Sequence, residues 1–251
     1  MPLRPVHVII KAIDHSGVGR FWAEALGWSA YSPGVTTYVG PGGGLVWPDP
    51  VFVGIDVVPE SGGRARAGAK NPVHLDLASE SLAHQAELVA RLRAAGATPV
   101  DVGQGDDVPW AVLADPEGTV FCVLEPREVY RDTGPIAAVV VDCADPRAMA
   151  RFWGAATGWT VHEVADDQAT LRSAAGVGPY LEFLRVPGTV PDADRDRVHL
   201  DLLPYPGDHQ AVEVARLRAL GATGLDVGQG DVPWTCLADP EGHAFCVLAP
   251  H

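Results

Sequence analysis

The chain has 251 residues, 47% of them apolar, and its 32 acidic residues outnumber its 18 lysines and arginines to give a net charge of −14. This apolar content is enough for a packed core, which excludes a disordered chain. The negative charge repels nucleic acid and anionic membrane surfaces, so we expect neither as a partner. The start MPLRPVHVIIKAID lacks the long apolar stretch of a signal peptide, and no run is long enough for a membrane span. We therefore expect a cytoplasmic protein.

The chain contains one sequence unit twice. RFWAEALGW returns as RFWGAATGW, ARLRAAGAT as ARLRALGAT, and VHLDL occurs in both halves of the chain. The spacing between equivalent residues is 131 at Trp22 and Trp153 but 124 at Asp115 and Asp239, so short insertions or deletions separate two copies. We therefore predict two domains, at residues 1–128 and 135–251.

Each copy shows the same order of elements, which is clearest in the second. The β-branched run at 137–144 predicts a strand. Asp145 followed by proline is typical of a helix start, and predicts a helix over 145–159. Three short apolar runs then predict three further strands, at 161–166, 168–174 and 180–187.

The rest of the copy repeats this order. Residues 197–203 predict a strand, 209–222 a helix that ends at Gly221, and 234–248 two strands about the turn ADPEG. In this turn the proline fixes φ and the glycine tolerates the last position, so we interpret it as a hairpin connector without a catalytic role. Each domain is thus βαβββ twice over, and four such modules make the chain.

This order, together with RFW…LGW, VHLDL, ARLRALGA and LADPEG…FCVL, resembles the vicinal oxygen chelate superfamily, in particular its tandem glyoxalase-like and bleomycin-resistance-type proteins. The resemblance covers almost the whole chain. It implies an α+β fold of two tandem glyoxalase-like domains, each with paired βαβββ modules that form a half-open barrel around a metal or a small ligand. The superfamily contains both enzymes and proteins that only bind, so the site decides the function.

The resemblance also implies a metal site. Metal-dependent members place a His on the first strand, a His on the strand that opens the second module, and a Glu on the last strand. In the first domain His7 and His74 match both histidines, and Cys122 stands at the place of the Glu. The resemblance therefore implies a divalent metal (Fe, Mn or Zn) at His7 and His74, if one is bound, and no other cofactor. In the second domain Ala138 and Cys246 replace the first and last ligands, so no complete metal centre is implied there.

Four residues are candidate catalytic groups. His74 and Asp76 lie two residues apart and share one face of their strand, and His199 repeats this arrangement in the second domain. A carboxylate beside an imidazole can orient it as a general base, although a structural ion pair is the alternative. Glu182 in YLEFL offers an oxygen, and we align it with Gly54 of the first copy.

Aromatic residues indicate a cavity for a planar ligand. Tryptophans precede the ADPEG turn at the same place in both copies, and further aromatic residues lie on neighbouring predicted strands. Core packing is the alternative for each of them. The candidate ligand-binding residues, including the two cysteines of the last strands, are Trp110, Trp234, Tyr180, Phe52, Cys122 and Cys246.

The sequence supports two functional hypotheses. In the first, the protein is a monomer or homodimer that binds or sequesters a small organic molecule, such as an aromatic metabolite or a drug. In the second, it is a metal-dependent lyase, isomerase or dioxygenase of the vicinal oxygen chelate type that uses His7 and His74.

Overall fold

The computed structural model describes residues 2–42, 54–59, 70–105, 107–187, 197–226 and 230–249. They form the four predicted modules. The first contains β1 (Arg4–Ala12), α1 (His15–Leu26), β2 (Ser29–Tyr31), β3 (Thr37–Gly40) and β4 (Gly54–Pro59). The second contains β5 (Val73–Leu77), α2 (Leu82–Ala94), β6 (Thr98–Pro99), β7 (Ala111–Ala114) and β8 (Val120–Val123).

The second copy follows after a short 3-10 helix, Glu128–Tyr130. Its first module contains β9 (Ile136–Cys143), α3 (Pro146–Thr157), β10 (Thr160–Val164), β11 (Gln168–Arg172) and β12 (Tyr180–Arg185). Its second contains β13 (Val198–Leu203), α4 (Gln210–Ala219), β14 (Thr223–Gly224), β15 (Thr235–Ala238) and β16 (Ala244–Val247). Among the described residues, no helix is both long and apolar enough to cross a membrane.

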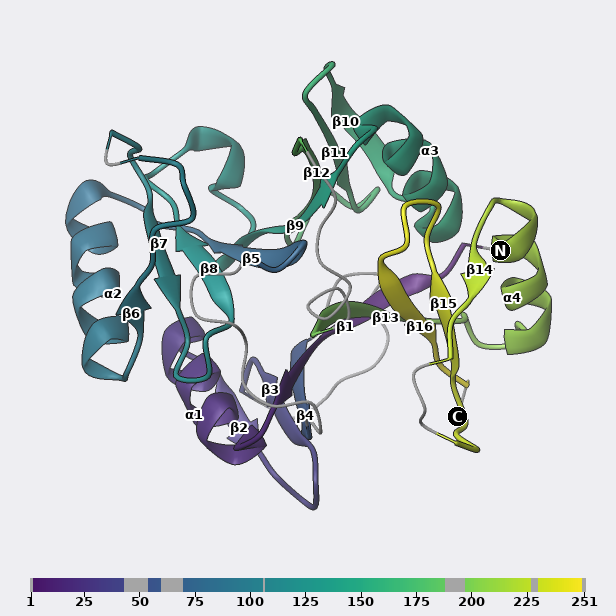
Figure 1. The fold of residues 1–251 in the computed structure, drawn as a ribbon, viewed down its shortest axis with the longest axis horizontal. Helices are drawn as coiled ribbons and strands as arrows, with labels where there is room; N and C mark the ends of the chain where they lie inside the picture. Colours follow the sequence, from purple (N-terminus) through teal and green to yellow (C-terminus); the bar gives the residue numbers. More distant parts are fainter. Residues whose placement is uncertain are drawn as a thin grey trace.

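The two copies exchange modules between two eight-stranded sheets (Figure 1). Sheet A has the order β14-β15-β16-β13-β1-β4-β3-β2 and sheet B the order β10-β11-β12-β9-β5-β8-β7-β6. The antiparallel pairs β1–β13 and β5–β9 join the modules at the centre of each sheet. Each sheet therefore takes one module from each copy. The two sequence repeats, residues 1–128 and 135–251, are each divided between the two sheets.

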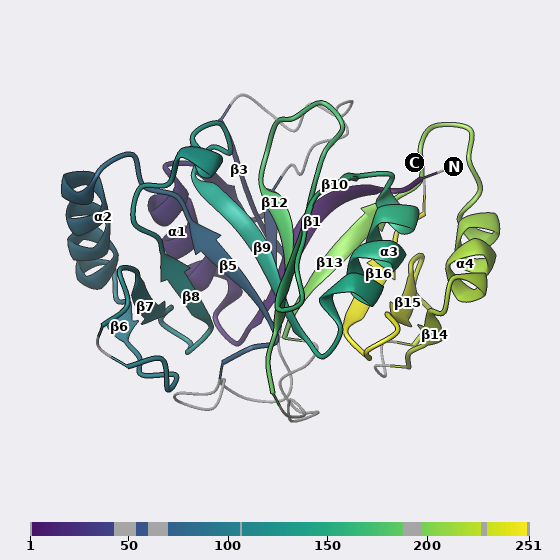
Figure 2. The same ribbon diagram turned by 90° about the horizontal axis from the view of Figure 1, so that it is seen from above.

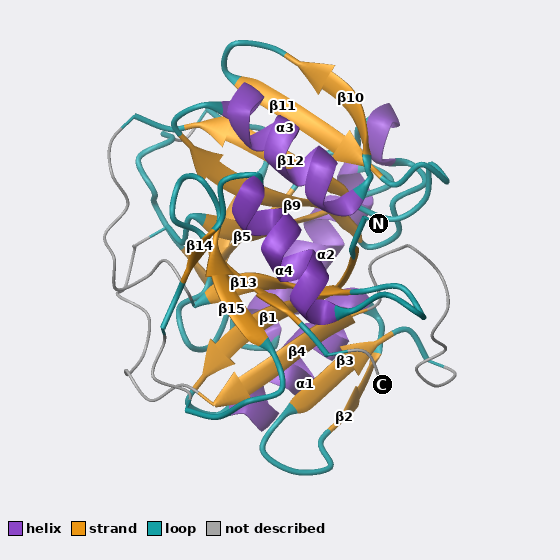
Figure 3. Ribbon diagram, turned by 90° about the vertical axis from the view of Figure 1, so that its right-hand side faces the viewer, coloured by secondary structure: helices purple, strands orange, loops and turns teal. Residues whose placement is uncertain are grey.

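The helices pack on one face of each sheet. Helix α1 contacts β2, β3 and β4 of sheet A, and α3 contacts β10, β11 and β12 of sheet B, as the side view of Figure 3 shows for α3. Helices α2 and α4 lie at opposite ends of the molecule (Figure 2). The two modules of one copy thus lie in different sheets, and in the first copy their helices α1 and α2 contact each other.

An aromatic contact joins the two modules of each copy. Trp22 of α1 packs edge-on against Phe121 of β8, with ring centroids 5.0 Å apart, although α1 lies on sheet A and β8 in sheet B. Trp153 and Phe245 repeat this contact at 5.2 Å in the second copy. Both tryptophans are at most 2% exposed, so the core of each copy lies between the two sheets.

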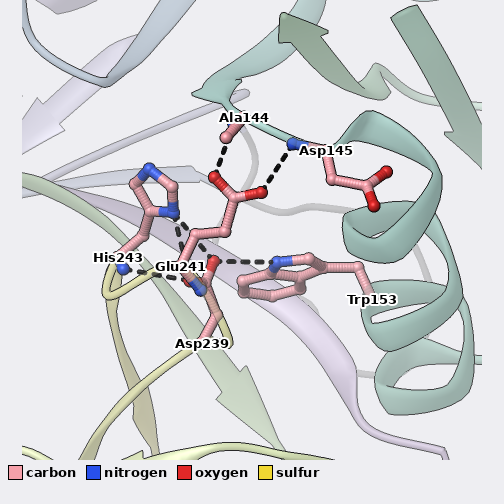
Figure 4. Close-up of polar contacts among 6 residues, drawn as sticks. All are labelled: Ala144, Asp145, Trp153, Asp239, Glu241 and His243. Atoms are coloured by element: carbon pink, nitrogen blue, oxygen red, sulfur yellow. Dashed lines mark hydrogen bonds and ion pairs between the residues drawn. The ribbon is translucent and has the colours of Figure 1, made fainter. Parts of the chain in front are cut away.

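The ADPEG turns form a second connection between modules. In the second copy, Asp239 Oδ1 accepts hydrogen bonds from the backbone nitrogens of Glu241 and His243, and Oδ2 accepts one from the Trp153 indole nitrogen at 3.2 Å (Figure 4). The turn is therefore the predicted hairpin connector. It also fixes a buried side chain of the neighbouring module.

The glutamates of these turns bind the start of the helices. Glu241 accepts hydrogen bonds from the backbone nitrogens of Ala144 and Asp145, at 2.6 and 2.8 Å, directly before α3. Glu117 accepts the equivalent bonds in front of α1, at 2.7 and 2.6 Å. We call the aspartate and glutamate of each turn, Asp115 with Glu117 and Asp239 with Glu241, the turn clasp.

Replacing Glu117 with alanine tests the clasp. The substitution removes two short hydrogen bonds from backbone amides to the Glu117 side chain, so we expect the free energy of unfolding to fall by about 2 to 3 kcal/mol. Denaturant unfolding measures this change. The control is Glu87→Ala, because Glu87 is an exposed residue of α2. A loss no larger than that of the control would contradict a structural role for the clasp.

The clasp of the second copy also predicts a dependence on pH. His243 Nδ1 lies 3.1 Å from both carboxylate oxygens of Asp239, whereas Thr119 occupies this place in the first copy. Burial opposes the charged ring, but the hydrogen bond and charge of Asp239 raise the pKa of His243 above 6.5. Protonated His243 therefore stabilises the fold below about pH 6.5, and this contribution is lost as the pH rises through the raised pKa.

We expect His243→Thr, which copies the first repeat, to reduce the free energy of unfolding more near pH 6 than near pH 9. Denaturant unfolding of both proteins across this range measures the difference. A loss of stability that does not change with pH would contradict the assignment of the proton to His243.

Candidate functional site

Each sheet carries polar side chains on the face that points away from the helix-packed core. On β5, Val73 and Leu75 belong to the main hydrophobic cluster, whereas the alternate residues His74 and Asp76 lie on the other side of the strand. We call this side the polar face of the sheet. The strand VHLDL supplies a His and an Asp to it in both copies, as the two-residue period predicts.

The polar face of sheet B holds a His–Asp–Cys group. Asp76 lies opposite Cys122 of β8, and His74 Nε2 is 3.7 Å from Asp76 Oδ1. One donor atom from each of the three residues lies within 4.8 Å of the others. Asp76 Oδ1 is buried and accepts no hydrogen bond from the described part of the chain. The group can therefore take a further hydrogen-bond donor or a cation.

Burial determines the protonation states of this group. It raises the pKa of Asp76 to about 7, and the charge of Glu182 adds to the rise. It lowers the pKa of His74 well below 6.5, helped by the positive charge of Lys70. It also raises the pKa of the Cys122 thiol, together with the charge of Asp76. At neutral pH, His74 is thus uncharged, Cys122 is a thiol, and Asp76 can accept or release a proton.

A cavity of about 350 Å³ contains this group. Its lining includes the aromatic rings of Trp110, Tyr130 and Tyr180, which we call the aromatic wall. The two tyrosine rings meet edge to face with centroids 5.8 Å apart, and the Arg127 guanidinium lies 5.8 Å from the centroids of Trp110 and Tyr130. The Tyr130 hydroxyl donates a 2.8 Å hydrogen bond to Glu182 Oε1, which joins the aromatic wall to the buried carboxyls.

The polar face of sheet A holds a second group, built from both copies. His7 of β1 lies opposite Asp201 of β13, and Asp201 lies opposite Cys246 of β16. His199 Nε2 is 3.7 Å from Asp201 Oδ1 and 3.7 Å from Cys246 Sγ. Asp56 of β4 adds a carboxylate whose Oδ2 lies 3.3 Å from His7 Nδ1.

Burial also shifts the pKa values of the groups on the polar face of sheet A. It lowers the pKa of His7 to about 4 and raises the pKa of Asp56 to about 7. It raises the pKa of Asp201 well above 3.8, and the charge of Asp56 adds to this rise. His7 is therefore neutral at pH 7, which is the form that binds a metal ion.

The structure separates the two histidines that the sequence predicted as one metal pair. His7 lies in sheet A and His74 in sheet B, because the modules of one copy belong to different sheets. The histidine that shares the polar face with His7 is His199, from the other copy.

The alignment of Glu182 with Gly54 is also wrong. Gly54 pairs with His7 across β1 and β4, and Tyr180 pairs with Ala138 across β9 and β12, so Gly54 corresponds to Tyr180. The residue that corresponds to Glu182 lies two positions later and is Asp56. The sequence comparison missed it because the matching proline of RVP and VVP set the register.

The remaining predicted residues lie in different places. Trp110 and Tyr180 line the cavity of sheet B. Trp234, the counterpart of Trp110, lines a separate hollow of about 410 Å³ together with Cys236. Phe52 lies outside the described residues.

Three further residues of these faces were not revealed by the sequence patterns. Arg127 and Tyr130 come from the segment between the copies, which was interpreted as a domain boundary. The remaining one, Cys236, lies directly opposite Cys246 in the β15–β16 hairpin. Their equal distance, three residues, from the connecting residues 239–243 was the one signal for this pairing.

A known protein family matches each of the two sequence repeats separately. The profile of the glyoxalase-like domain family matches residues 7–124 and again residues 138–248. The chain belongs to this glyoxalase-like domain family. No curated protein matches it in sequence.

Two solved structures share the fold of this glyoxalase-like chain over nearly its whole length. Glyoxalase I from Zea mays has a TM-score of 0.65 at 16% identity, with 98% of this chain and 92% of that chain covered. A putative dioxygenase from Bacillus subtilis subsp. subtilis str. 168 has a TM-score of 0.60 at 14% identity, with 100% and 86% covered. At these identities the similarity shows the fold alone.

The donor sets of the glyoxalase-like protein fit a divalent metal. On sheet A, the imidazoles of His7 and His199 share one face with the Cys246 sulfur and two carboxylates. Nitrogen, oxygen and sulfur donors of this kind bind Zn²⁺ or Fe²⁺. On sheet B, the three donors are His74, Asp76 and Cys122.

Tyr130→Phe tests the link between the aromatic wall and the buried carboxyls. Because the Tyr130 hydroxyl holds down the pKa of Glu182, its loss should raise that pKa further and reduce the free energy of unfolding by about 1 to 2 kcal/mol at neutral pH. Denaturant unfolding and a carboxyl titration by NMR measure the two effects. The control is Tyr31→Phe, because Tyr31 is 66% exposed. Equal effects of both substitutions would contradict the role of the hydrogen bond.

Proposed function

We propose that this glyoxalase-like protein binds a small organic molecule with an aromatic ring in the cavity of sheet B. The volume of about 350 Å³ falls within the range of ligand sites, about 300 to 1,000 Å³. The observation that carries the proposal is the lining by Trp110, Tyr130 and Tyr180 beside buried carboxyls. Aromatic side chains bind planar ligands through stacked and edge-to-face contacts.

The buried carboxyls indicate the polar end of this ligand. Asp76 and Glu182 both have raised pKa values because burial disfavours their charged forms. A hydrogen-bond donor or a positive charge on the ligand would reach Asp76 Oδ1, which accepts no hydrogen bond from the described residues. We infer an amphipathic ligand whose ring contacts the aromatic wall and whose donor group points to Asp76.

The residues of sheet B favour ligand binding without a catalysed reaction. Ala138 occupies the position on β9 that His7 occupies on β1, so this face lacks one of the two imidazoles of sheet A. Cys122 remains a protonated thiol, since burial and the charge of Asp76 raise its pKa. Sequestration of a drug or an aromatic metabolite fits this set of residues.

Sheet A supports a second function. His7 and His199 share its polar face, so a metal-dependent lyase, isomerase or dioxygenase of the vicinal oxygen chelate type would use this pair in place of His7 and His74. A metal held there would act as a Lewis acid toward two oxygens of a substrate. Asp56, whose pKa is about 7, would exchange a proton near neutral pH.

Trp110→Ala tests the binding proposal. A screen of aromatic compounds by thermal shift finds a ligand, and titration calorimetry then measures its affinity for each protein. We expect Trp110→Ala to weaken binding by about tenfold or more, because a ring contact worth about 1.4 kcal/mol is lost. Trp234→Ala is the matched control, since Trp234 has the equivalent place in the other copy but lines a different hollow.

Two results would contradict the proposal. One is a screen in which no aromatic compound shifts the unfolding temperature. The other is a ligand whose affinity falls equally in Trp110→Ala and Trp234→Ala, because such a ligand does not distinguish the cavity of sheet B from the hollow beside sheet A.

A further inference from the structure

Two cysteines face each other on the polar face of sheet A. The β15–β16 hairpin places Cys236 directly opposite Cys246, and their sulfur atoms are 3.1 Å apart. Neither sulfur is in a disulfide. Two sulfur donors therefore lie side by side, where sheet B has a single one.

A histidine and an aspartate lie next to these sulfurs. His199 Nε2 is 3.7 Å from Cys246 Sγ and 3.7 Å from Asp201 Oδ1. Asp201 is 7% exposed, and its Oδ1 is buried without a hydrogen-bond donor among the described residues. A buried carboxylate oxygen of this kind is costly unless a donor or a cation reaches it.

We propose that Cys236, Cys246, His199 and Asp201 bind one thiophilic divalent cation of the zinc type. Bond lengths to zinc and tetrahedral angles place neighbouring donor atoms about 3.4 to 3.8 Å apart. The two observed distances of 3.7 Å fall in this range. The two sulfurs, at 3.1 Å, need to separate by a few tenths of an ångström, which a small rotation of the Cys236 side chain provides.

One of the four proposed ligands borders a hollow of the surface. Cys236 is only partly buried and lines the hollow of about 410 Å³ that it shares with Trp234 and Thr235. Asp56 lies 3.3 Å from His7, and His7 lies opposite Asp201, so the face concentrates acidic groups that a cation neutralises. Buried acidic groups are stabilised in their charged form by a nearby positive charge.

Sheet B supplies an internal comparison. His74, Asp76 and Cys122 repeat the arrangement of His199, Asp201 and Cys246, including the same 3.7 Å distance from imidazole to carboxylate. Opposite Cys122, however, stands Val112 in place of a second cysteine. Sheet B therefore lacks one sulfur donor, and the pair Val112–Cys122 shows that this fold accepts valine at the equivalent position.

The inference concerns sheet A and does not depend on ligand binding in sheet B. It assigns a residue, Cys236, that is not among the metal ligands implied by the resemblance. A ligand screen that finds no compound for the cavity of sheet B leaves it unaffected.

The experiment measures metal binding by the full chain. Protein stripped of metal and kept reduced is titrated with Zn²⁺ against a chromophoric chelator, and with Co²⁺ while the absorption is recorded. We expect one tightly bound ion per chain and a sulfur-to-cobalt charge-transfer band in the near ultraviolet. We expect Cys236→Val to weaken zinc binding at least about 100-fold and to reduce this band.

Cys143→Val is the control, because Cys143 is a buried thiol of the main hydrophobic cluster and belongs to neither donor group. We expect it to leave the zinc affinity and the cobalt spectrum unchanged, while the unfolding temperature of each metal-free variant verifies its fold. The proposal is overturned if the unmodified protein binds no zinc or shows no sulfur-to-cobalt band. It is also overturned if Cys236→Val binds as tightly as the unmodified protein, or if Cys143→Val abolishes binding.

Discussion

The hydrogen bonds that Glu117 and Glu241 accept in front of α1 and α3 are the constraint on which the rest of the structure depends. Each joins two modules that lie next to each other in sequence but in different sheets. The buried bond from the Trp153 indole to Asp239 reinforces the same connection in the second copy. Since the clasps direct the helix-packed faces toward each other, they leave the opposite faces of both sheets for polar groups. On β5 and β13, one face of the strand thus packs in the core and the other carries the polar side chains of the site.

The exchange of modules lets one repeated sequence build two different sites. Both polar faces inherit a His, an Asp and a Cys from the same repeated motifs. Sheet A adds His7 and Asp56, whereas Ala138 and Glu182 occupy the equivalent positions of sheet B. Sheet B in turn has the aromatic wall, because the segment between the copies places Arg127 and Tyr130 beside it. The binding cavity and the cation site that we propose follow from these differences.

Both sites keep ionisable groups in places where charge is unfavourable. Burial raises the pKa of Asp56 and of Asp76 to about 7, and lowers the pKa of the neighbouring histidines. Nearby groups offset part of this cost. The Lys70 ammonium, for example, lies 2.9 Å from Asp142 and also acts on Asp76. Buried acids of this kind are typical of functional sites, because a ligand or an ion can supply the missing partner.

The sequence by itself determined the repeat, the order of strands and helices, the hairpin at ADPEG and the shared face of His74 and Asp76. These features depend on local rules, namely turn chemistry and the two-residue period of a strand. Only the tertiary structure decided which modules share a sheet. The strands β5 and β13 share the sequence VHLDL, so local pattern cannot distinguish pairing of β1 with the strand of its own copy from pairing with that of the other copy. For that reason the sequence paired His7 with His74, whereas the fold places His7 on one face of a sheet with His199. Long-range strand pairing thus determined the composition of both sites.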